Sequence, residues 1–305
     1  MKIIKALFIG AVILFIVVIH PCKALDSSDD DYWFASSLIS TEDYSEAITF
    51  LRRYVLFGDN PQRQLNARFI IGSLYAKLDR HDRAVSTFLG IMNEREIEQE
   101  LREGAAFLAI QSMFLNDDLA GYHVCLDRLE DDLGELSIDG RIQRQYMKGF
   151  LGVYAGSRDL AEFLPIATDL EPIKSRSVDL KRQFVFWEER KIRSPLTSAV
   201  LSAAIPGTGQ FYNRRYWDGV AAMGVVLGGA YWSRELFDRG DNSWGWTVGI
   251  ITGLLYLGQI RNSMIDSMRI NEKAELEFKQ QLISDYFLKF TFSVKQDDIR
   301  FGITF

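Results

Sequence analysis

Side chains that commonly perform catalysis or bind metals are scarce in this chain of 305 residues, which has three histidines and two cysteines. A pair such as His123 and Cys125 does not make a metal site, and both positions fit the face of a helix. No order of serine, histidine and aspartate indicates a catalytic triad, and no nucleophile elbow is present. We therefore expect no catalytic residue, no metal ligand and no cofactor, and we expect that the protein is not an enzyme.

A glycine-rich segment at residues 206–212 is the remaining place where chemistry is conceivable. Gly207-Thr208-Gly209 lacks the further glycines and the preceding strand of a nucleotide-binding loop, so we interpret it as a turn that ends a short apolar helix. Gln210 and Tyr212 flank Phe211, next to apolar segments that we interpret below as membrane helices. Polar groups at the depth of a membrane need hydrogen-bond partners. We expect both side chains to hydrogen bond to the backbone freed at this break and to hold the short helix against the apolar segments downstream.

The first 24 residues have the pattern of a secretory signal peptide. Lys2 and Lys5 form a basic start, residues 6–19 are uninterrupted apolar, and Cys22-Lys23-Ala24 is an acceptable cleavage site. An uncleaved anchor is the alternative, although this apolar stretch is short for a membrane span. The pattern predicts export, and a net charge of −6 gives no indication of a nucleic-acid partner.

From residue 32 to about residue 192 the pattern is helical, with apolar residues three and four positions apart and with glycine and proline between segments. Two successive units share their spacing of small and large apolar residues, and equivalent alanines, Ala47 and Ala84, are 37 residues apart. This part resembles a tetratricopeptide-repeat domain, in which small residues let antiparallel helices approach; a generic helical bundle is the alternative. The residues expected to pack the repeats are Ala35, Ala47, Gly72, Tyr75, Ala84 and Phe88.

Two uncharged, glycine-rich segments come after the break, at residues 219–233 and 244–260, and the loop between them carries charges of both signs. Tyrosine and tryptophan flank the first segment, as in the aromatic belts of membrane helices. Glycines four positions apart let two helices in lipid pack backbone to backbone. We therefore predict a membrane hairpin, with two buried helices of a soluble domain as the alternative. The expected packing residues are Gly224, Gly228, Gly245, Gly249 and Gly253.

The break and the hairpin together carry a second resemblance. Pro206-Gly207-x-Gly209-Gln210-x-Tyr212, followed by Gly219 and two apolar segments, is similar to an uncharacterised family of bacterial envelope proteins. The resemblance covers roughly residues 194–278. It implies a membrane location, in which Pro206, Gly207, Gly209, Gln210 and Tyr212 form the entry to the hairpin, and it implies no known catalytic activity.

Toward the end of the chain, the spacing of apolar residues changes from that of a helix to that of a β-strand. Residues 262–284 predict a charged amphipathic helix, and residues 285–305 then alternate apolar and polar side chains in two runs, which predicts a β-hairpin. We expect this hairpin to dock on a neighbouring element or to pair with another chain. The alternative is an outer-membrane role, because the last run is similar to the final strand of outer-membrane proteins.

The predicted fold is mainly α, with a tetratricopeptide-like helical solenoid, a transmembrane helical hairpin and a short C-terminal β-hairpin. The predicted parts are a signal peptide, a helical-repeat domain, a membrane hairpin with its entry break, an amphipathic helix and a β-hairpin tail, at residues 1–24, 25–192, 193–261, 262–284 and 285–305.

The parts together predict a membrane-anchored scaffold in the bacterial cell envelope, whose repeats bind a protein or peptide partner. The alternative is an oligomeric membrane-embedded assembly or transport component in which the hairpin is the functional part and contacts lipid and further copies of the chain. Basic residues flank the open side of the hairpin, which by itself would place that side in the cytoplasm, whereas export places the repeats outside it. We favour periplasmic repeats and the inner membrane, with the outer membrane as the alternative.

Overall fold

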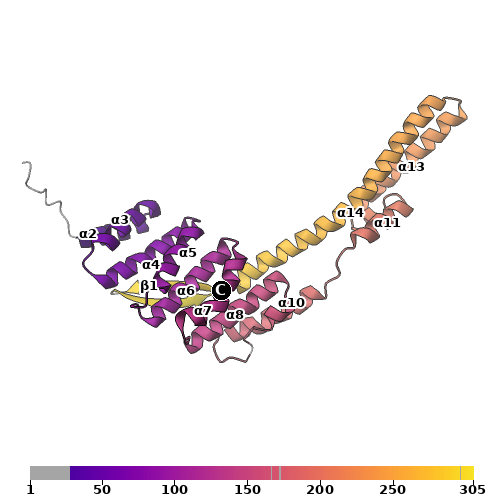
Figure 1. Ribbon diagram of the computed structural model, residues 1–305. Helices are drawn as coiled ribbons and strands as arrows, with labels where there is room; N and C mark the ends of the chain where they lie inside the picture. The colour runs from indigo at the N-terminus through magenta and orange to yellow at the C-terminus, as the bar shows by residue number, and fades with distance from the viewer. Residues whose placement is uncertain (1–27, 166, 172, 296) are drawn as a thin grey trace, which may run out of the picture. The chain divides into compact units, whose positions relative to one another are not determined.

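The computed structural model of the protein in Figure 1 describes residues 28–165, 167–171, 173–295 and 297–305. These residues are mainly helical and end in a two-stranded antiparallel sheet, as the sequence predicts. They form two units. The first holds the described residues up to Leu151 with Glu162–Lys174 and Leu288–Phe305, and the second holds Gly152–Ala161 and Ser175–Phe287. The predicted signal peptide lies outside the described residues.

Successive helices of the first unit pack against one another in chain order, from α2 through α7. The turns after α2, α4 and α6 each contain one acidic residue with a positive φ, namely Glu42, Asp79 and Asp117. These connections therefore have the same backbone feature at intervals of 37 and 38 residues. The helices of this unit are α2 (Ser28–Ser40), α3 (Tyr44–Phe57), α4 (Pro61–Lys77), α5 (His81–Met92), α6 (Gln99–Leu115), α7 (Leu119–Leu133) and most of α8 (Ile138–Ala155).

Small residues let these helices approach closely. A Cβ added to Gly72 of α4 would lie 2.6 Å from the ring of Phe88 in α5, so the ring occupies the space that a side chain would need. The three alanines predicted at the contacts, Ala35, Ala47 and Ala84, are fully buried, and Tyr75 is buried as well. All six residues predicted to pack the repeats therefore lie in the core of the first unit.

The C-terminal β-hairpin belongs to the first unit. Strands β1 (Lys289–Lys295) and β2 (Asp298–Thr304) are antiparallel, with Phe292 opposite Phe301. The ring of Phe69 in α4 lies 5.5 Å from that of Phe292 and 5.7 Å from that of Phe301. Phe107 of α6 stacks on Phe290 at 4.7 Å. The predicted hairpin is confirmed, and the neighbours on which it docks are helices of its own chain.

The second unit contains the glycine-rich segments. Helix α14 runs without interruption across the boundary predicted between residues 261 and 262, because no glycine or proline occurs from residue 259 to residue 286. The predicted hairpin segment and the predicted amphipathic helix are thus one helix. The helices of this unit are α9 (Arg158–Ala161), most of α10 (Ile173–Glu188), α11 (Pro195–Ala204), α12 (Thr208–Tyr212), α13 (Tyr216–Asp238) and α14 (Asn242–Tyr286).

Helices α13 and α14 pack side by side along the glycine-rich segments. None of the described helices combines the length and the apolar character needed to cross a membrane. The transmembrane character predicted for this pair therefore has no support in the structure. The physical reason is that glycine, serine and threonine dilute the apolar side chains of both helices, and that charged residues follow the apolar part of α13.

Candidate functional site

The glycine-rich break brings together the residues that were predicted to form the entry to the hairpin. Ser194 caps the first turn of α11 by accepting a hydrogen bond from the backbone N–H of Thr197 at 3.2 Å, with Pro195 at the first helical position. The chain leaves this helix at Ile205 and turns at Gly207, whose φ is 86°. A side chain at Gly207 would be strained by this φ and would collide with the carbonyl oxygen of Gly219. Both observations require glycine there.

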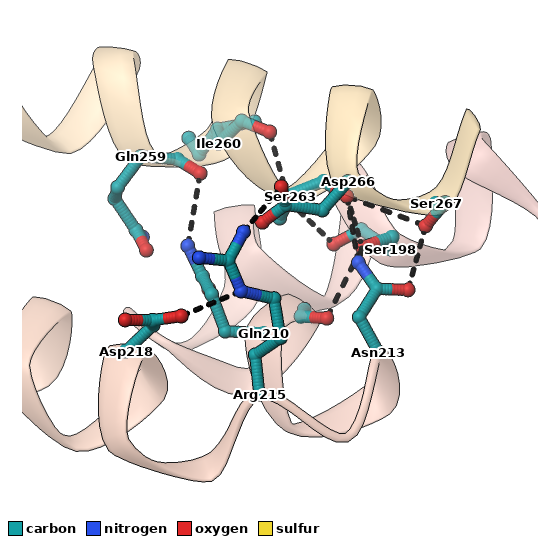
Figure 2. A network of polar contacts seen from close by, with 11 residues as sticks. Ser198, Gln210, Asn213, Arg215, Asp218, Gln259, Ile260, Ser263, Asp266 and Ser267 are labelled. Carbon is teal, nitrogen blue, oxygen red and sulfur yellow. Dashed lines mark hydrogen bonds and ion pairs between the residues drawn. The ribbon is translucent and has the colours of Figure 1, made fainter. Parts of the chain in front are cut away.

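Two glutamines connect the break to α14 (Figure 2). The Gln259 side-chain oxygen accepts a hydrogen bond from the backbone N–H of Gly207 at 3.1 Å, which satisfies a donor freed by the break. The Gln210 amide in turn donates to the carbonyl oxygen of Gln259 at 3.2 Å. The backbone N–H of Gly209 donates to the Ser202 hydroxyl at 3.1 Å, and this hydroxyl lies 3.4 Å from the side-chain oxygen of Gln210. The hydrogen bonds of Gln259 to Gly207 and of Gln210 to Gln259 therefore hold the break against α14.

Tyr212 closes the other end of the same segment. Its hydroxyl accepts a hydrogen bond from the backbone N–H of Ser194 at 3.0 Å, and the guanidinium of Arg193 lies 5.3 Å from its ring centre. We predicted that Gln210 and Tyr212 hydrogen bond to the backbone freed at the break. Each side chain bonds to a backbone group, but Gln210 bonds to the carbonyl oxygen of Gln259 within α14, and Tyr212 bonds to the N–H of Ser194. The freed backbone at the break itself is satisfied chiefly by Gln259 and Ser202, which the sequence pattern did not indicate.

Asn213 is the centre of a second set of hydrogen bonds, also drawn in Figure 2. Its amide donates to the carbonyl oxygen of Ser263 at 2.8 Å and to the hydroxyl of Ser198 at 3.0 Å. Its side-chain oxygen accepts from the Ser267 hydroxyl at 2.8 Å. All four residues are buried, and each amide or hydroxyl in the set has a partner. Such a fully connected polar network holds three parts of the chain in one arrangement: α11, α14, and Asn213 itself, which follows α12.

An ion pair lies beside this network. Arg215 contacts the buried carboxylate of Asp266 at 2.5 Å and the carboxylate of Asp218 at 2.5 Å. The guanidinium is about half exposed, so one side of the pair remains open to the surroundings. Two acids compensate one base in this geometry, and the serine hydroxyls drawn nearby, those of Ser198, Ser263 and Ser267, all donate hydrogen bonds within the chain.

The contact between α13 and α14 follows a spacing of seven residues. Buried positions seven apart are Gly219, Val226 and Ser233 on α13, and Gly245, Thr252, Gln259 and Asp266 on α14, whereas the buried Ser263 and Ser267 of α14 face α11 and Asn213. A spacing of seven keeps one face of each helix toward its partner when two helices pack at a small angle. A search for small and polar residues seven apart would have identified Gln259 and Asp266 in the sequence.

The predicted packing glycines divide into two groups. Added Cβ atoms at Gly245 and Gly249 would meet Phe237 and Ser233 of α13 at 2.9 and 3.0 Å, so these two glycines lie at the helix contact. Gly224, Gly228 and Gly253 have no described atom within 4 Å of an added Cβ, so they do not pack this helix pair. Two of the five predicted glycines therefore pack the pair and three do not, because the contact follows buried positions that are seven residues apart.

The surface around this polar interior is apolar. The buried side chains of α11 are Ser198 and Ser202, whereas Leu196 and Val200 of the same helix are 72% and 58% exposed. Helices α13 and α14 likewise bury small and polar residues at their contact and expose apolar side chains. Its exposed large apolar side chains include Val220, Val225, Leu227, Tyr231, Trp232, Trp244, Trp246, Ile250, Ile251, Leu254, Leu255 and Leu257.

The residues considered first for metal binding or catalysis stay apart. His123 pairs with Asp127 at 3.0 Å, and His81 with Asp79 at 3.1 Å. Burial raises the pKa of the Cys125 thiol to about 11, which keeps it protonated and unreactive near neutral pH. Among the described residues, no group of three histidine, cysteine, aspartate or glutamate side chains is placed to hold a metal ion.

Comparison with known proteins identifies one region of the chain. Residues 191–243 match the sequence profile of a family of unknown function, DUF5683. This stretch contains the break and the whole of α13, and it ends at the start of α14. No curated protein and no solved structure matches the chain. The similarity to a family of unknown function therefore falls on the segment that carries the Pro-Gly-x-Gly-Gln-x-Tyr motif.

Proposed function

We propose that the protein is a scaffold of the bacterial cell envelope, in which the second unit is embedded in lipid and the first unit binds a protein or peptide partner. The observation that carries the proposal is the inverted polarity of the glycine-rich part of the second unit, which comprises α11, α12, α13 and the first half of α14. Its helices bury serine, threonine, asparagine and glutamine and expose leucine, isoleucine, valine and tryptophan.

A lipid surrounding accounts for this inversion. In lipid, apolar side chains on the outside carry no penalty, and helices associate through small residues and hydrogen bonds. In water, each exposed leucine or isoleucine forgoes about 1.5–3 kcal/mol that burial would contribute. Gly245, Gly249 and Thr252 at the helix contact and the amide network at the break are the kind of interface that lipid favours. Aromatic residues at both ends of α13, from Tyr216 to Trp232, agree with interfacial anchoring.

The proposal is one of embedding and does not require either helix to cross the bilayer alone. The uncharged segments of 15 and 17 residues correspond to about 22 and 25 Å of helix, less than the apolar thickness of about 30 Å. Local thinning of the bilayer and outward reach of flanking charged side chains accommodate such a mismatch at modest cost. The predicted export signal motivates a periplasmic position for the first unit, at the inner membrane.

Features of the first unit support a tetratricopeptide-like scaffold. The repeated turn residues at 42, 79 and 117 and the contact of Gly72 with Phe88 are what antiparallel helix pairs of one repeat type require. The β-hairpin covers α4 and α6, and Phe305 contacts Tyr146 of α8 at 5.5 Å. The face formed by these alternate helices is therefore occupied by the chain itself, and we place partner binding elsewhere on the unit.

Membrane fractionation of the full-length protein tests the lipid part of the proposal. We expect the wild-type chain to remain in the membrane pellet after alkaline carbonate extraction. Replacing Ile250, Leu254 and Leu257 together by glutamate places three charges on one exposed stripe of α14 and should release the protein. The control is Leu276→Glu, because Leu276 is similarly exposed on the same helix but outside the pair. Carbonate-soluble wild-type protein, or a triple variant that stays in the pellet, would contradict the proposal.

One observation favours the alternative function, an oligomeric assembly component. Gly224, Gly228 and Gly253 leave smooth surface on the outer faces of the pair, where another helix could approach closely in lipid. In that case Gly224→Leu with Gly228→Leu would abolish chemical crosslinking between copies while membrane retention stays unchanged. Crosslinking that is unaffected by this variant would remove the alternative.

A further inference from the structure

A cavity in the first unit is separate from the break and from the glycine-rich helix pair. It has a volume of about 540 Å³ and lies among α3, α4 and α5. This size is within the range of pockets that bind small ligands or single side chains, about 300–1,000 Å³. Arg52 of α3 and Arg83 of α5 both contribute to its wall, so two positive charges face one apolar-sided hollow.

Three side chains in this cavity offer hydrogen-bond donors for which the described residues supply no acceptor. Within the described ranges, neither Arg52 nor Arg83 forms an ion pair, whereas Arg53, Arg63 and Arg68 of neighbouring helices each pair with an acidic residue. The guanidinium of Arg83 lies 5.7 Å from the centre of the Tyr75 ring. Tyr75 is only 6% exposed, and its hydroxyl makes no hydrogen bond to any described residue. The hydroxyl is not among the fully enclosed atoms that lack a partner, so it is open to the cavity and can donate a hydrogen bond to an acceptor there.

The rest of the lining is apolar on one side and accepts hydrogen bonds on the other. Val55, Leu56 and Ile71 supply aliphatic surface, and Leu56 is 73% exposed. Ser86 and Thr87 each donate their hydroxyl proton to the carbonyl oxygen of Arg83, at 2.9 and 2.8 Å. Their oxygen atoms are left free to accept from an N–H group.

We propose that this cavity binds a carboxylate carried by an apolar group. Two guanidiniums and a phenol hydroxyl supply charge-assisted hydrogen bonds to the carboxylate oxygens. The aliphatic wall receives the apolar group beside it. The C-terminus of a peptide that ends in an apolar residue and a free aliphatic acid share this chemistry. The inference deepens the partner-binding part of the proposed function and rests on it, but it does not depend on lipid embedding.

Calorimetric titration of the purified full-length chain in a non-ionic detergent tests the proposal. The probes are hexanoate, its neutral counterpart hexanamide, inorganic phosphate, and N-acetyl-Ala-Leu with either a free or an amidated C-terminus. We expect both acids to bind saturably, with a Kd on the order of 1 mM or lower, and to bind at least tenfold more tightly than the amides and phosphate. Tighter binding of the dipeptide acid than of hexanoate identifies a peptide ligand, and equal binding identifies a small acid.

Variants separate the cavity from general effects on the fold. Arg52→Gln with Arg83→Gln should weaken binding of the acids at least tenfold, and Tyr75→Phe, which keeps the buried ring, should weaken it several-fold. The matched control is Arg95→Gln, because Arg95 is an exposed arginine of the same unit outside the cavity. Saturable binding by neither acid, equal binding of acid and amide, or unchanged binding in both cavity variants would overturn the proposal. These outcomes leave the carbonate extraction result unaffected, so the two proposals fail separately.

Discussion

The first unit and the glycine-rich part of the second unit distribute polar and apolar side chains in opposite ways. The largest fully buried side chains of the first unit are tyrosine, phenylalanine, leucine and isoleucine, with Phe69, Phe88 and Ile110 among them. At the break in the second unit the buried side chains are Ser198, Gln210, Asn213 and other small polar groups. The first unit is organised by removal of apolar surface from water. The glycine-rich part of the second unit is organised by hydrogen bonds and by close approach of helix backbones. Under the proposed lipid embedding, these are the forces that remain available.

The two regions should also differ in how they respond to amino-acid substitutions. An apolar core loses stability when volume is removed, because a cavity remains. A connected polar network loses stability when one partner is removed, because the other buried groups are left unsatisfied. Substitutions in the first unit should therefore destabilise through lost packing, and substitutions at the break through unsatisfied hydrogen-bonding groups. The comparison would be contradicted if both kinds of substitution had the same effects.

The largest effect is expected for Phe69→Ala in the first unit. Phe69 is fully buried and its ring contacts Phe88, Phe292 and Phe301, so truncation removes the anchor of the β-hairpin. We expect a loss of about 3–5 kcal/mol in the free energy of unfolding, with early proteolysis within residues 288–305. Chemical denaturation and mass spectrometry of the fragments measure both. Phe57→Ala is the control, because Phe57 is 71% exposed in the same unit, and a similar loss in both variants would contradict the expectation.

The next effect is expected for Gly207→Val at the break. Valine would be strained at a φ of 86° and would collide with the Gly219 carbonyl, so the turn after α11 could not stay against the start of α13. We expect a loss of about 3 kcal/mol from strain and displaced packing together. Faster hydrogen exchange at residues 195–215, with unchanged exchange in the first unit, would confirm it. Gly253→Ala serves as the control, since open space surrounds an added Cβ there, and equal effects at both glycines would disprove the assignment.

A smaller effect is expected for Gln210→Ala. The substitution leaves the carbonyl of Gln259 and the hydroxyl of Ser202 without one partner each, which should cost about 1–3 kcal/mol. The amount of membrane-retained protein and its thermal midpoint should both fall. Gln280→Ala removes the same side chain from an exposed site on α14 and should change neither. Unchanged midpoint and retention in Gln210→Ala would show that the network is not needed to hold the break.

The last prediction concerns the rate at which the Cys125 thiol is alkylated and involves no change in stability. Burial raises the pKa of its thiol to about 11, above the value of about 8.5 for a free thiol. A raised pKa means that less thiolate is present at pH 8 in the folded chain than in the unfolded chain. Alkylation by iodoacetamide at pH 8 should therefore be at least tenfold slower than in urea, and the difference should shrink as the pH rises toward 11. Equal rates in both states would show that the apolar interior does not enclose this thiol.

Local sequence patterns were sufficient where the physical cause is local or repeated. The alternation of Phe290, Phe292 and Val294 with polar residues predicted β1, because side chains of a strand point alternately to opposite faces. The spacing of Gly72, Tyr75, Ala84 and Phe88 predicted which residues enter the core of the first unit. Gly207 predicted a turn, since few other residues adopt its positive φ.

The location of the helix contact could not be predicted in the same way. The glycines four residues apart suggested one face for packing, but three of them lie on outer faces. The choice between a four-residue and a seven-residue spacing depends on the angle at which two helices cross, which neither helix specifies alone. Gln259 was unrecognised for the same reason: its partner at Gly207 is 52 residues away along the chain.

The sequence by itself determined the helical character, the break after α11, the C-terminal β-hairpin and the scarcity of catalytic side chains. Each of these follows from the properties of neighbouring residues, such as periodicity, proline and glycine. Only the tertiary structure decided that the β-hairpin docks on α4 and α6, that Gln259 and Asn213 organise the break, and that the glycine-rich part of the second unit carries its polar side chains inside. These features depend on contacts between residues far apart in the chain, whose geometry is set by packing and not by local preference.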